Sequence, residues 1–183
     1  ITSFEQPTVE QFKEAIEYAQ DKKADSLIID LRENSGGLVD SASQMLDMLL
    51  DEGVLMYAHY RDDVRVEAKS DKNHIDLKMA VIVNGNTASA SEYFASAIRD
   101  YQKGKLIGNK TYGKGIMQTT FELSDGSAVR LTVATVTTKN KVNYHEVGLT
   151  PDVEVNYTEE QQKVYYKLGD KDPYILKAIK TVE

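Results

Sequence analysis

The sequence has no cysteine among its 183 residues. This absence excludes disulfides, thiolate metal sites and a cysteine nucleophile. It leaves the cellular compartment open, because a cysteine-free protein suits oxidising and reducing surroundings equally. Histidine is also scarce: His59, His74 and His145 are the only ones, and no set of them has the spacing of metal ligands or of a catalytic motif. A Ser-His-Asp arrangement therefore has little support, and the histidines are expected in polar loops.

Long apolar runs and an excess of positive charge are missing as well. No run approaches the roughly 20 apolar residues that a membrane span needs. The net charge is -7, and the lysines are scattered among acidic residues. A nucleic-acid surface needs concentrated basic charge, so the composition argues against DNA or RNA as a partner.

The length of 183 residues favours a single domain, residues 1–183, around one core. Ile1–Phe4 opens without an initiator methionine. We therefore expect the chain to begin inside a longer protein, with any export signal outside it.

The first half of the chain predicts helices and strands in alternation. Thr8 and Gln11 have capping-box spacing, which predicts a helix over roughly residues 8–22. Two strand–turn–helix units follow. Their strands are Ser26–Arg32 and Lys78–Val83, and their helices run from Leu38 to a stop at Gly53 and from the Ser89 turn to near Gly104. Such crossovers usually build a largely parallel sheet with ligand sites at the carboxyl ends of its strands, so the Gly37 and Ser89 turns are expected side by side.

Beyond Gly113, apolar residues recur at every second position, as in a strand with one buried face. Residues 117–123 and 128–138 predict a hairpin around the turn Ser124–Gly126, and Val153–Val155 predicts a short strand. The tail from Glu159 is a helix candidate, and Leu176 and Ile179 are expected to dock it on the body. The predicted fold class is α/β with an added β-hairpin.

A serine and a lysine in two short runs suggest a nucleophile and its base. Ser89 stands at a probable helix start, where free amides could stabilise an oxyanion. A serine attacks a carbonyl only if a neighbouring base takes its proton, and a lysine whose pKa is lowered by burial can do so. Ser89 with Glu92 is also a complete capping box, which is usually only structural. Thr87 and Ser91 compete with Ser89, although Ser89 and Ser91 cannot both face one base on a helix.

Lys114, between two glycines, has its own alternatives. Gly108–Lys114 fits the beginning of a phosphate-binding P-loop, but Gly115 stands where a Ser or Thr should hold magnesium, and residues 116–121 resemble a strand rather than a helix. An exposed turn lysine is a further possibility. Gln118, four residues on, would share a strand face with Lys114 and could orient its amine.

Gly36 and Gly37 have two interpretations. They form either a plain tight turn before a helix, or a turn in which a glycine amide comes close to a substrate carbonyl oxygen and donates a hydrogen bond to it. Asp30 and Arg32 are interpreted as a structural ion pair or as solvated strand ends.

Five runs occur in the order seen in the carboxyl-terminal processing peptidases, or tail-specific proteases, and the chain resembles that family over roughly residues 9–155. The runs are Leu27–Leu38, Asn84–Glu92, Thr111–Gly115 with Gln118, Phe121–Gly126 and Val147–Val153.

The resemblance implies a Ser/Lys serine endopeptidase that cleaves protein substrates near their C-terminal tails, with a core similar to the crotonase and caseinolytic-protease folds. It assigns Ser89 as nucleophile, Lys114 as general base and Gln118 as the residue that positions Lys114. The amides of Ala90 and of Gly36 or Gly37 would form the oxyanion hole. No metal or organic cofactor is implied.

Two departures from the family pattern stand out. Ser35 occupies a position where proline is common, and no segment resembles the PDZ module that family members usually carry ahead of the core. The chain is therefore expected to be an excised catalytic core.

The implied partner is a protein or peptide with an accessible C-terminal tail, and the chain could form a homo-oligomer. Kinship further suggests a location outside the cytoplasm. The competing hypothesis is a noncatalytic module that binds extended peptides in the same cleft.

Overall fold

Two four-stranded sheets organise the molecule. The computed structural model describes residues 1–183 and has a mixed α/β architecture. The first sheet is parallel, with the order β1 (Ser26–Asp30), β4 (Lys78–Val83), β5 (Gly104–Gly108) and β8 (Val153–Glu154). The second is antiparallel, with the order β3 (Val64–Ser70), β2 (Gly53–His59), β7 (Ala128–Thr137) and β6 (Ile116–Glu122).

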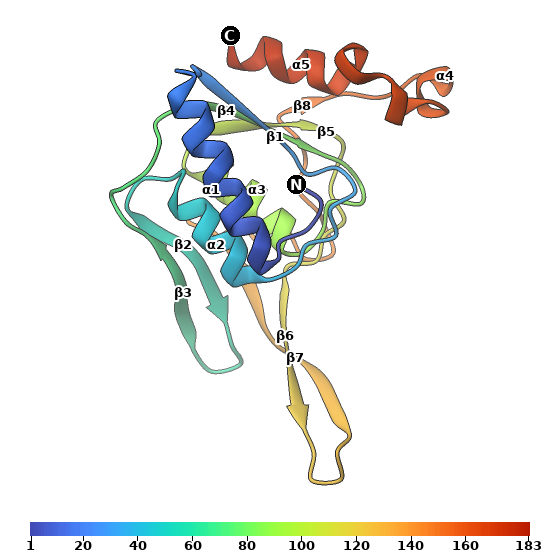
Figure 1. Cartoon of the computed structure of the whole chain (residues 1–183). Helices are drawn as coiled ribbons and strands as arrows, with labels where there is room; N and C mark the ends of the chain where they lie inside the picture. The colour runs from blue at the N-terminus through green and yellow to red at the C-terminus, as the bar shows by residue number, and fades with distance from the viewer.

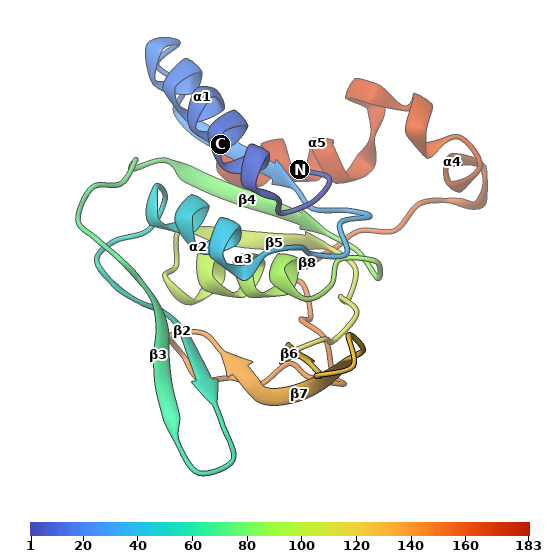
Figure 2. The ribbon, with the colours of Figure 1, turned by 60° about the horizontal axis from the view of Figure 1, so that its bottom comes forward.

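Helices cover both faces of the parallel sheet (Figures 1 and 2). On one face lie α2 (Val39–Asp47) and α3 (Ala90–Asp100), with α1 (Gln6–Asp21) packed on α2, and on the other lies α5 (Pro173–Val182). Successive side chains of β4 point to opposite faces of the sheet. Val81 packs in the core with α2 and α3, whereas Ala80 and Ile82 pack against α5. This explains why Lys78–Val83 is an almost continuous apolar run.

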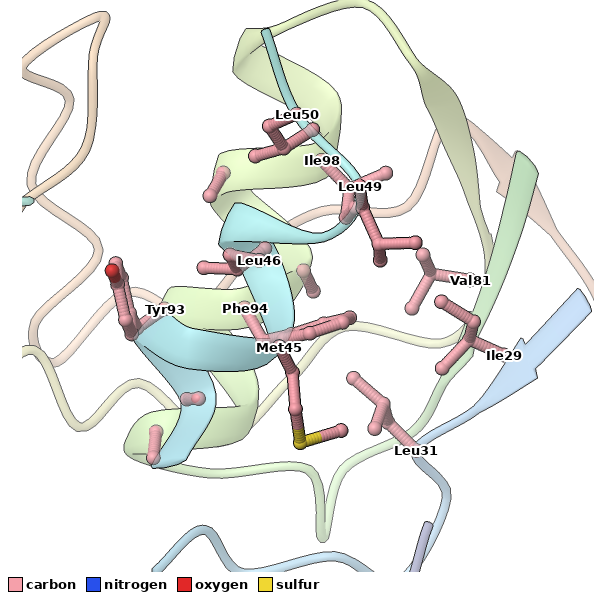
Figure 3. Close-up of a cluster of buried hydrophobic side chains, with 14 of the residues drawn as sticks. Ile29, Leu31, Met45, Leu46, Leu49, Leu50, Val81, Tyr93, Phe94 and Ile98 are labelled. Atoms are coloured by element: carbon pink, nitrogen blue, oxygen red, sulfur yellow. The ribbon is translucent and has the colours of Figure 1, made fainter. Parts of the chain in front are cut away.

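The larger core lies between the α2–α3 pair and the parallel sheet (Figure 3). Leu46 of α2, Leu49 just after this helix and Phe94 of α3 are fully buried there and face Ile29 and Val81 of the strands. The two helices predicted after the Gly37 and Ser89 turns are both present, and each begins at the carboxyl end of the sheet.

The helix predicted over roughly residues 8–22 is confirmed, but Thr8 does not cap its start. α1 begins at Gln6 after the N-cap Glu5, with Pro7 in its first turn, where proline needs no hydrogen-bond partner for its nitrogen. The Thr8 hydroxyl accepts from the Glu5 amide at 3.3 Å and donates to the Ser3 carbonyl at 3.1 Å. Thr8 therefore ties the helix to the preceding segment instead of starting it.

The predicted stop at Gly53 is also wrong. α2 ends at Asp47, and Gly53 opens β2, where an added Cβ would lie 2.4 Å from the Tyr101 hydroxyl. The strands β2, β3 and β5 were not predicted.

The C-terminal tail docks through other residues than expected. It contains α4 (Glu159–Gln162), two short 3-10 turns (Tyr165–Lys167 and Gly169–Lys171) and α5. Leu176 and Ile179 are 45% and 39% exposed, whereas Tyr174, Ala178 and Val182 are buried against β4 and β5. Positions four apart share a helix face, and the buried set follows that spacing.

The hairpin predicted around Ser124–Gly126 is confirmed as β6–β7, which projects beyond the rest of the molecule (Figure 1). None of the helices is both long enough and apolar enough to cross a bilayer.

Candidate active site

Ser89 occupies a tight turn between β4 and α3, at the carboxyl end of the parallel sheet. Its backbone has φ 59° and ψ -121°, a combination that is rare for a residue with a side chain. Such strain costs of order 1–3 kcal/mol and persists where the surroundings impose it, often at functional sites. The structure therefore holds Ser89 in a conformation that capping a helix does not require.

The structure distinguishes Ser89 from the two competing hydroxyls. Thr87 is fully buried, and its hydroxyl donates to the Leu31 carbonyl at 2.8 Å. Ser91 is fully buried, and its hydroxyl has no partner. Only Ser89 is partly exposed, so it alone of the three can meet a molecule from solvent.

A buried carboxylate joins the Ser89 turn to the Lys114 loop. Glu92 is fully buried, and its Oε2 accepts from the backbone amides of Ser89 at 3.0 Å and Lys114 at 2.7 Å. Its Oε1 accepts from the Gly113 amide at 2.7 Å and the Thr111 hydroxyl at 2.6 Å. One side chain thus brings together two runs that lie more than 20 residues apart in sequence, and Lys114 keeps a partly exposed side chain with no ion pair.

The glycine turn lies directly against the Ser89 turn, as expected. A Cβ added at Gly36 would lie 2.9 Å from Ser89 Cβ and 3.0 Å from the Ala90 nitrogen. The Gly36 amide is occupied, since it donates to Asn34 Oδ1 at 2.9 Å. The amides of Gly37 and Ala90 donate to no protein acceptor. Of the two glycines, Gly37 is therefore the one whose amide remains free for an incoming oxygen.

Contrary to the prediction from the sequence, Lys114 and Gln118 do not share one face of a regular strand. β6 begins only at Ile116, and a register shift between Met117 and Gln118 interrupts the alternation. The Gln118 amide donates to the Thr132 hydroxyl at 3.4 Å. Its assigned role toward Lys114 stays a prediction.

Gly108–Lys114 is not a P-loop. The chain after Lys114 enters strand β6, whereas a P-loop leads into a helix whose N-terminus receives the phosphate.

Sequence reasoning missed several residues that shape this site. Asn34 is fully buried and holds Gly36, and the Thr111 hydroxyl links Glu92 to the Leu149 amide at 2.7 Å. Tyr144 lies beneath Gly115 with its hydroxyl buried and unpartnered. Burial, with the Glu92 charge nearby, raises the Tyr144 pKa and keeps the phenol neutral.

The histidines are only partly where they were expected. His145 lies in a turn, and its Nδ1 is 3.3 Å from the carbonyl of Gly113, the residue before Lys114. His59 is instead part of β2, where its Nε2 is 2.9 Å from the Thr137 hydroxyl.

The ion pair predicted between Asp30 and Arg32 is confirmed at 2.6 Å. Arg32 also binds Asp172 at 2.7 Å, which fixes the segment before α5 to the end of β1. Burial opposes the charge of Asp172, but hydrogen bonds from Arg32 and Tyr157 outweigh it and lower the pKa of this carboxyl.

The family model described as Peptidase family S41 matches residues 1–155. The chain belongs to peptidase family S41. Over 194 aligned residues it is 35% identical to a probable CtpA-like serine protease of Staphylococcus epidermidis, and it is 34% identical to the protein of the same name from Staphylococcus aureus. Each alignment covers 100% of this chain and 38% of the relative, so this S41 chain spans well under half the length of those proteins.

Two solved structures share the fold of this chain. A photosystem II D1 C-terminal processing protease superposes with a TM-score of 0.83 at 33% identity, covering 96% of this chain and 47% of that one. A putative S41 protease from Bacteroides fragilis has a TM-score of 0.76 at 23% identity, over 98% of this chain and 52% of that one, and shows the shared fold.

Proposed function

We propose that this chain is the catalytic core of a serine endopeptidase that cleaves protein substrates near their C-terminal tails through a Ser/Lys acyl-enzyme mechanism. The observation that carries the proposal is the shared Glu92 carboxylate, which holds the strained Ser89 turn and the Lys114 loop against each other. Membership of family S41 and the names of the relatives support peptidase chemistry.

In the proposed first step the neutral Lys114 amine accepts the Ser89 hydroxyl proton while Oγ attacks the peptide carbonyl. The amides of Ala90 and Gly37, both without a protein acceptor, stabilise the resulting oxyanion. The Lys114 ammonium then gives its proton to the leaving amine as the carbon–nitrogen bond breaks, which leaves an ester on Ser89.

Deacylation repeats these roles with water. Lys114 takes a proton from the attacking water, a second oxyanion forms at the same amides, and the proton returns to Ser89 Oγ as the carboxylic acid departs. Gln118 is proposed to position Lys114, by resemblance to the family alone.

Three further proposals rest on kinship. They are relatedness of this core to the crotonase and caseinolytic-protease folds, a location outside the cytoplasm, and recognition of an accessible C-terminal tail. The tail proposal is tested with an unstructured substrate whose tail is either free or followed by a fused folded domain, and faster cleavage of the free tail is expected.

The catalytic proposal is tested with Ser89→Ala and Lys114→Ala. Each is expected to lower kcat/KM at least about 10³-fold while circular dichroism remains native, because the nucleophile or its base is lost. The matched controls are Ser91→Ala, which removes a buried hydroxyl with no partner, and Lys105→Ala, which removes an exposed lysine outside the site. Native activity in Ser89→Ala or Lys114→Ala, or an equal loss in the controls, would contradict the assignment.

A further inference from the structure

A groove of about 470 Å³ lies beside the candidate active site, between α2 and the antiparallel sheet. Figure 1 shows α2 next to β2 and β3 on this side of the molecule. One end of the groove adjoins the site, because Val39 follows Gly37 by two positions and Met117 follows Lys114 by three. The helix residues that line it continue to Asp47, at the last turn of α2.

The apolar part of the lining suits an extended peptide. It consists of Val39, Met56, Ala68 and Met117. The α2 segment along the groove rises about 12 Å, at 1.5 Å per residue. An extended chain rises about 3.3 Å per residue, so the groove accommodates about four residues.

Three of the six polar residues that line the groove are acidic. Asp40 accepts from the Gln44 amide at 2.9 Å, Asp47 from the Asp71 backbone amide at 2.6 Å and Glu67 from the Tyr60 hydroxyl at 2.9 Å. All three donors are neutral, and none of these carboxylates forms an ion pair.

Lys69 is the one cation that lines the groove, and it forms no ion pair either. Three carboxylates against one ammonium leave two negative charges uncompensated. The groove therefore combines apolar contact surface with carboxylates that lack a cationic partner.

We propose that this groove binds the substrate segment next to the cleaved bond and selects lysine or arginine side chains in it. The aliphatic stem of either residue can pack on Met56 or Met117 while its charged end reaches a groove carboxylate. The assignment rests on the proposed peptidase function, because only a substrate held at Ser89 would extend into the groove from this end.

Peptide binding to the Ser89→Ala chain tests the assignment without cleavage. The probes are fluorescein-labelled peptides of alternating alanine and lysine, alanine and glutamate, or alanine and glutamine, followed by fluorescence anisotropy. We expect the lysine peptide to bind about tenfold tighter than the glutamine peptide, from the two charge pairs of ordinary strength that about four groove-bound residues can form. Added salt should reduce the difference.

A triple variant separates the groove from the overall charge. D40N, D47N and E67Q together keep each acceptor oxygen and remove the charges, so the lysine preference should fall to within about twofold. The matched control is E10Q, E14Q and D21N on exposed positions of α1, which changes the net charge equally and should keep the preference.

Equal affinity for the lysine and glutamate peptides, absence of binding, or an equal loss of preference in the two triple variants would overturn the assignment. Cleavage by the chain with Ser89 intact is a separate measurement. Cleavage without a charge preference defeats the groove assignment alone, whereas charge-selective binding without cleavage defeats the peptidase proposal alone.

Discussion

At the scale of single residues, the contact between Gly36 and the Ser89 turn leaves no room for a side chain. Gly36 has φ +110°, and its missing Cβ would meet both Ser89 Cβ and the Ala88 carbonyl at 2.9 Å. We expect Gly36→Ala to displace the Ser89 turn and lower kcat/KM by about 10²-fold, because shifts of about 1 Å at a reacting group have effects of that size. Steady-state peptidase kinetics provide the measurement.

Gly126→Ala is the matched control for Gly36→Ala. Gly126 also has a positive φ, +83°, but nothing lies within 4 Å of its added Cβ. The substitution should cost about 1–2 kcal/mol of backbone strain and leave kcat/KM unchanged. If both variants lose the same activity, backbone strain explains the effect and the contact with Ser89 does not.

Glu92→Gln tests the link between the Ser89 turn and the Lys114 loop. A glutamine keeps one acceptor oxygen but turns an NH₂ group toward amides that already donate. With hydrogen bonds to a charged group lost in a fully buried site, we expect the free energy of unfolding to fall by about 2–5 kcal/mol and kcat/KM to fall with it.

Urea unfolding and peptidase assays of Glu92→Gln and the exposed control Glu14→Gln provide the comparison. Unchanged stability and unchanged activity in Glu92→Gln would show that the carboxylate does not hold the site together.

The sequence allowed Ser89 and Lys114 to be predicted as a pair, because both lie in short runs with recognisable chemistry. It identified Glu92 only as a local cap, since three of its four partners lie about 20 residues downstream. It also left Gly36 and Gly37 as equal alternatives. The choice between them depends on Asn34, which occupies the Gly36 amide through a side-chain bond that no apolar pattern reveals.

At the scale of elements, helix α3 and the β6–β7 hairpin contribute very differently to stability. Phe94 is fully buried between α2 and the parallel sheet, whereas Leu131 on the projecting hairpin is 51% exposed. We expect Phe94→Ala to lower the free energy of unfolding by about 3–5 kcal/mol and Leu131→Ala by less than about 1 kcal/mol. Urea denaturation followed by circular dichroism measures both, and similar losses would contradict the difference in burial between Phe94 and Leu131.

Most elements with a strong apolar period were predicted, whereas β5, which has none, was not. α2, α3 and β4 have clear stripes or runs. β5 was missed because Gly104–Gly108 begins and ends with glycine, which the sequence pattern does not associate with a strand. Gly104 leaves no room for a side chain, because an added Cβ would lie 2.7 Å from the Met79 carbonyl oxygen of the neighbouring strand. β3 does alternate apolar and polar residues from Val64 to Lys69, so the sequence carried a strand signal there that was overlooked.

At the scale of the whole molecule, the C-terminal tail is fixed to the parallel sheet by a cluster that joins distant parts of the chain. Arg32 at the end of β1 binds Asp172 at 2.7 Å, and Tyr157 donates to the same carboxyl at 2.8 Å. The sequence predicted the pair of Asp30 with Arg32, which are two residues apart. It could not predict Asp172, because 140 residues separate it from Arg32 and only the packing of α5 on β4 brings them together.

This cluster predicts a loss of stability in acid. The folded pKa of Asp172 lies below the ordinary value of 3.8, so its contribution is fully present above about pH 4 and is lost as the pH falls through the folded pKa. Asp172→Asn should lower the free energy of unfolding at pH 7 by about 2–4 kcal/mol, because a buried charge pair loses one partner. Below pH 4 the native chain should approach the variant, and the difference between them should shrink.

Urea unfolding followed by tyrosine fluorescence at pH 7, 4 and below measures this difference, with Asp62→Asn as the control because Asp62 is exposed and forms no ion pair. The control should follow the native chain at every pH. A difference between Asp172→Asn and the native chain that stays constant down to the lowest pH would mean that the Asp172 charge is not what stabilises the tail. The Tyr174 amide donates to Asp172 at 2.9 Å, and an asparagine oxygen can accept the same hydrogen bond, so this bond would not explain a constant difference either. The difference in stability would then have to arise from the packing of the Asp172 side chain.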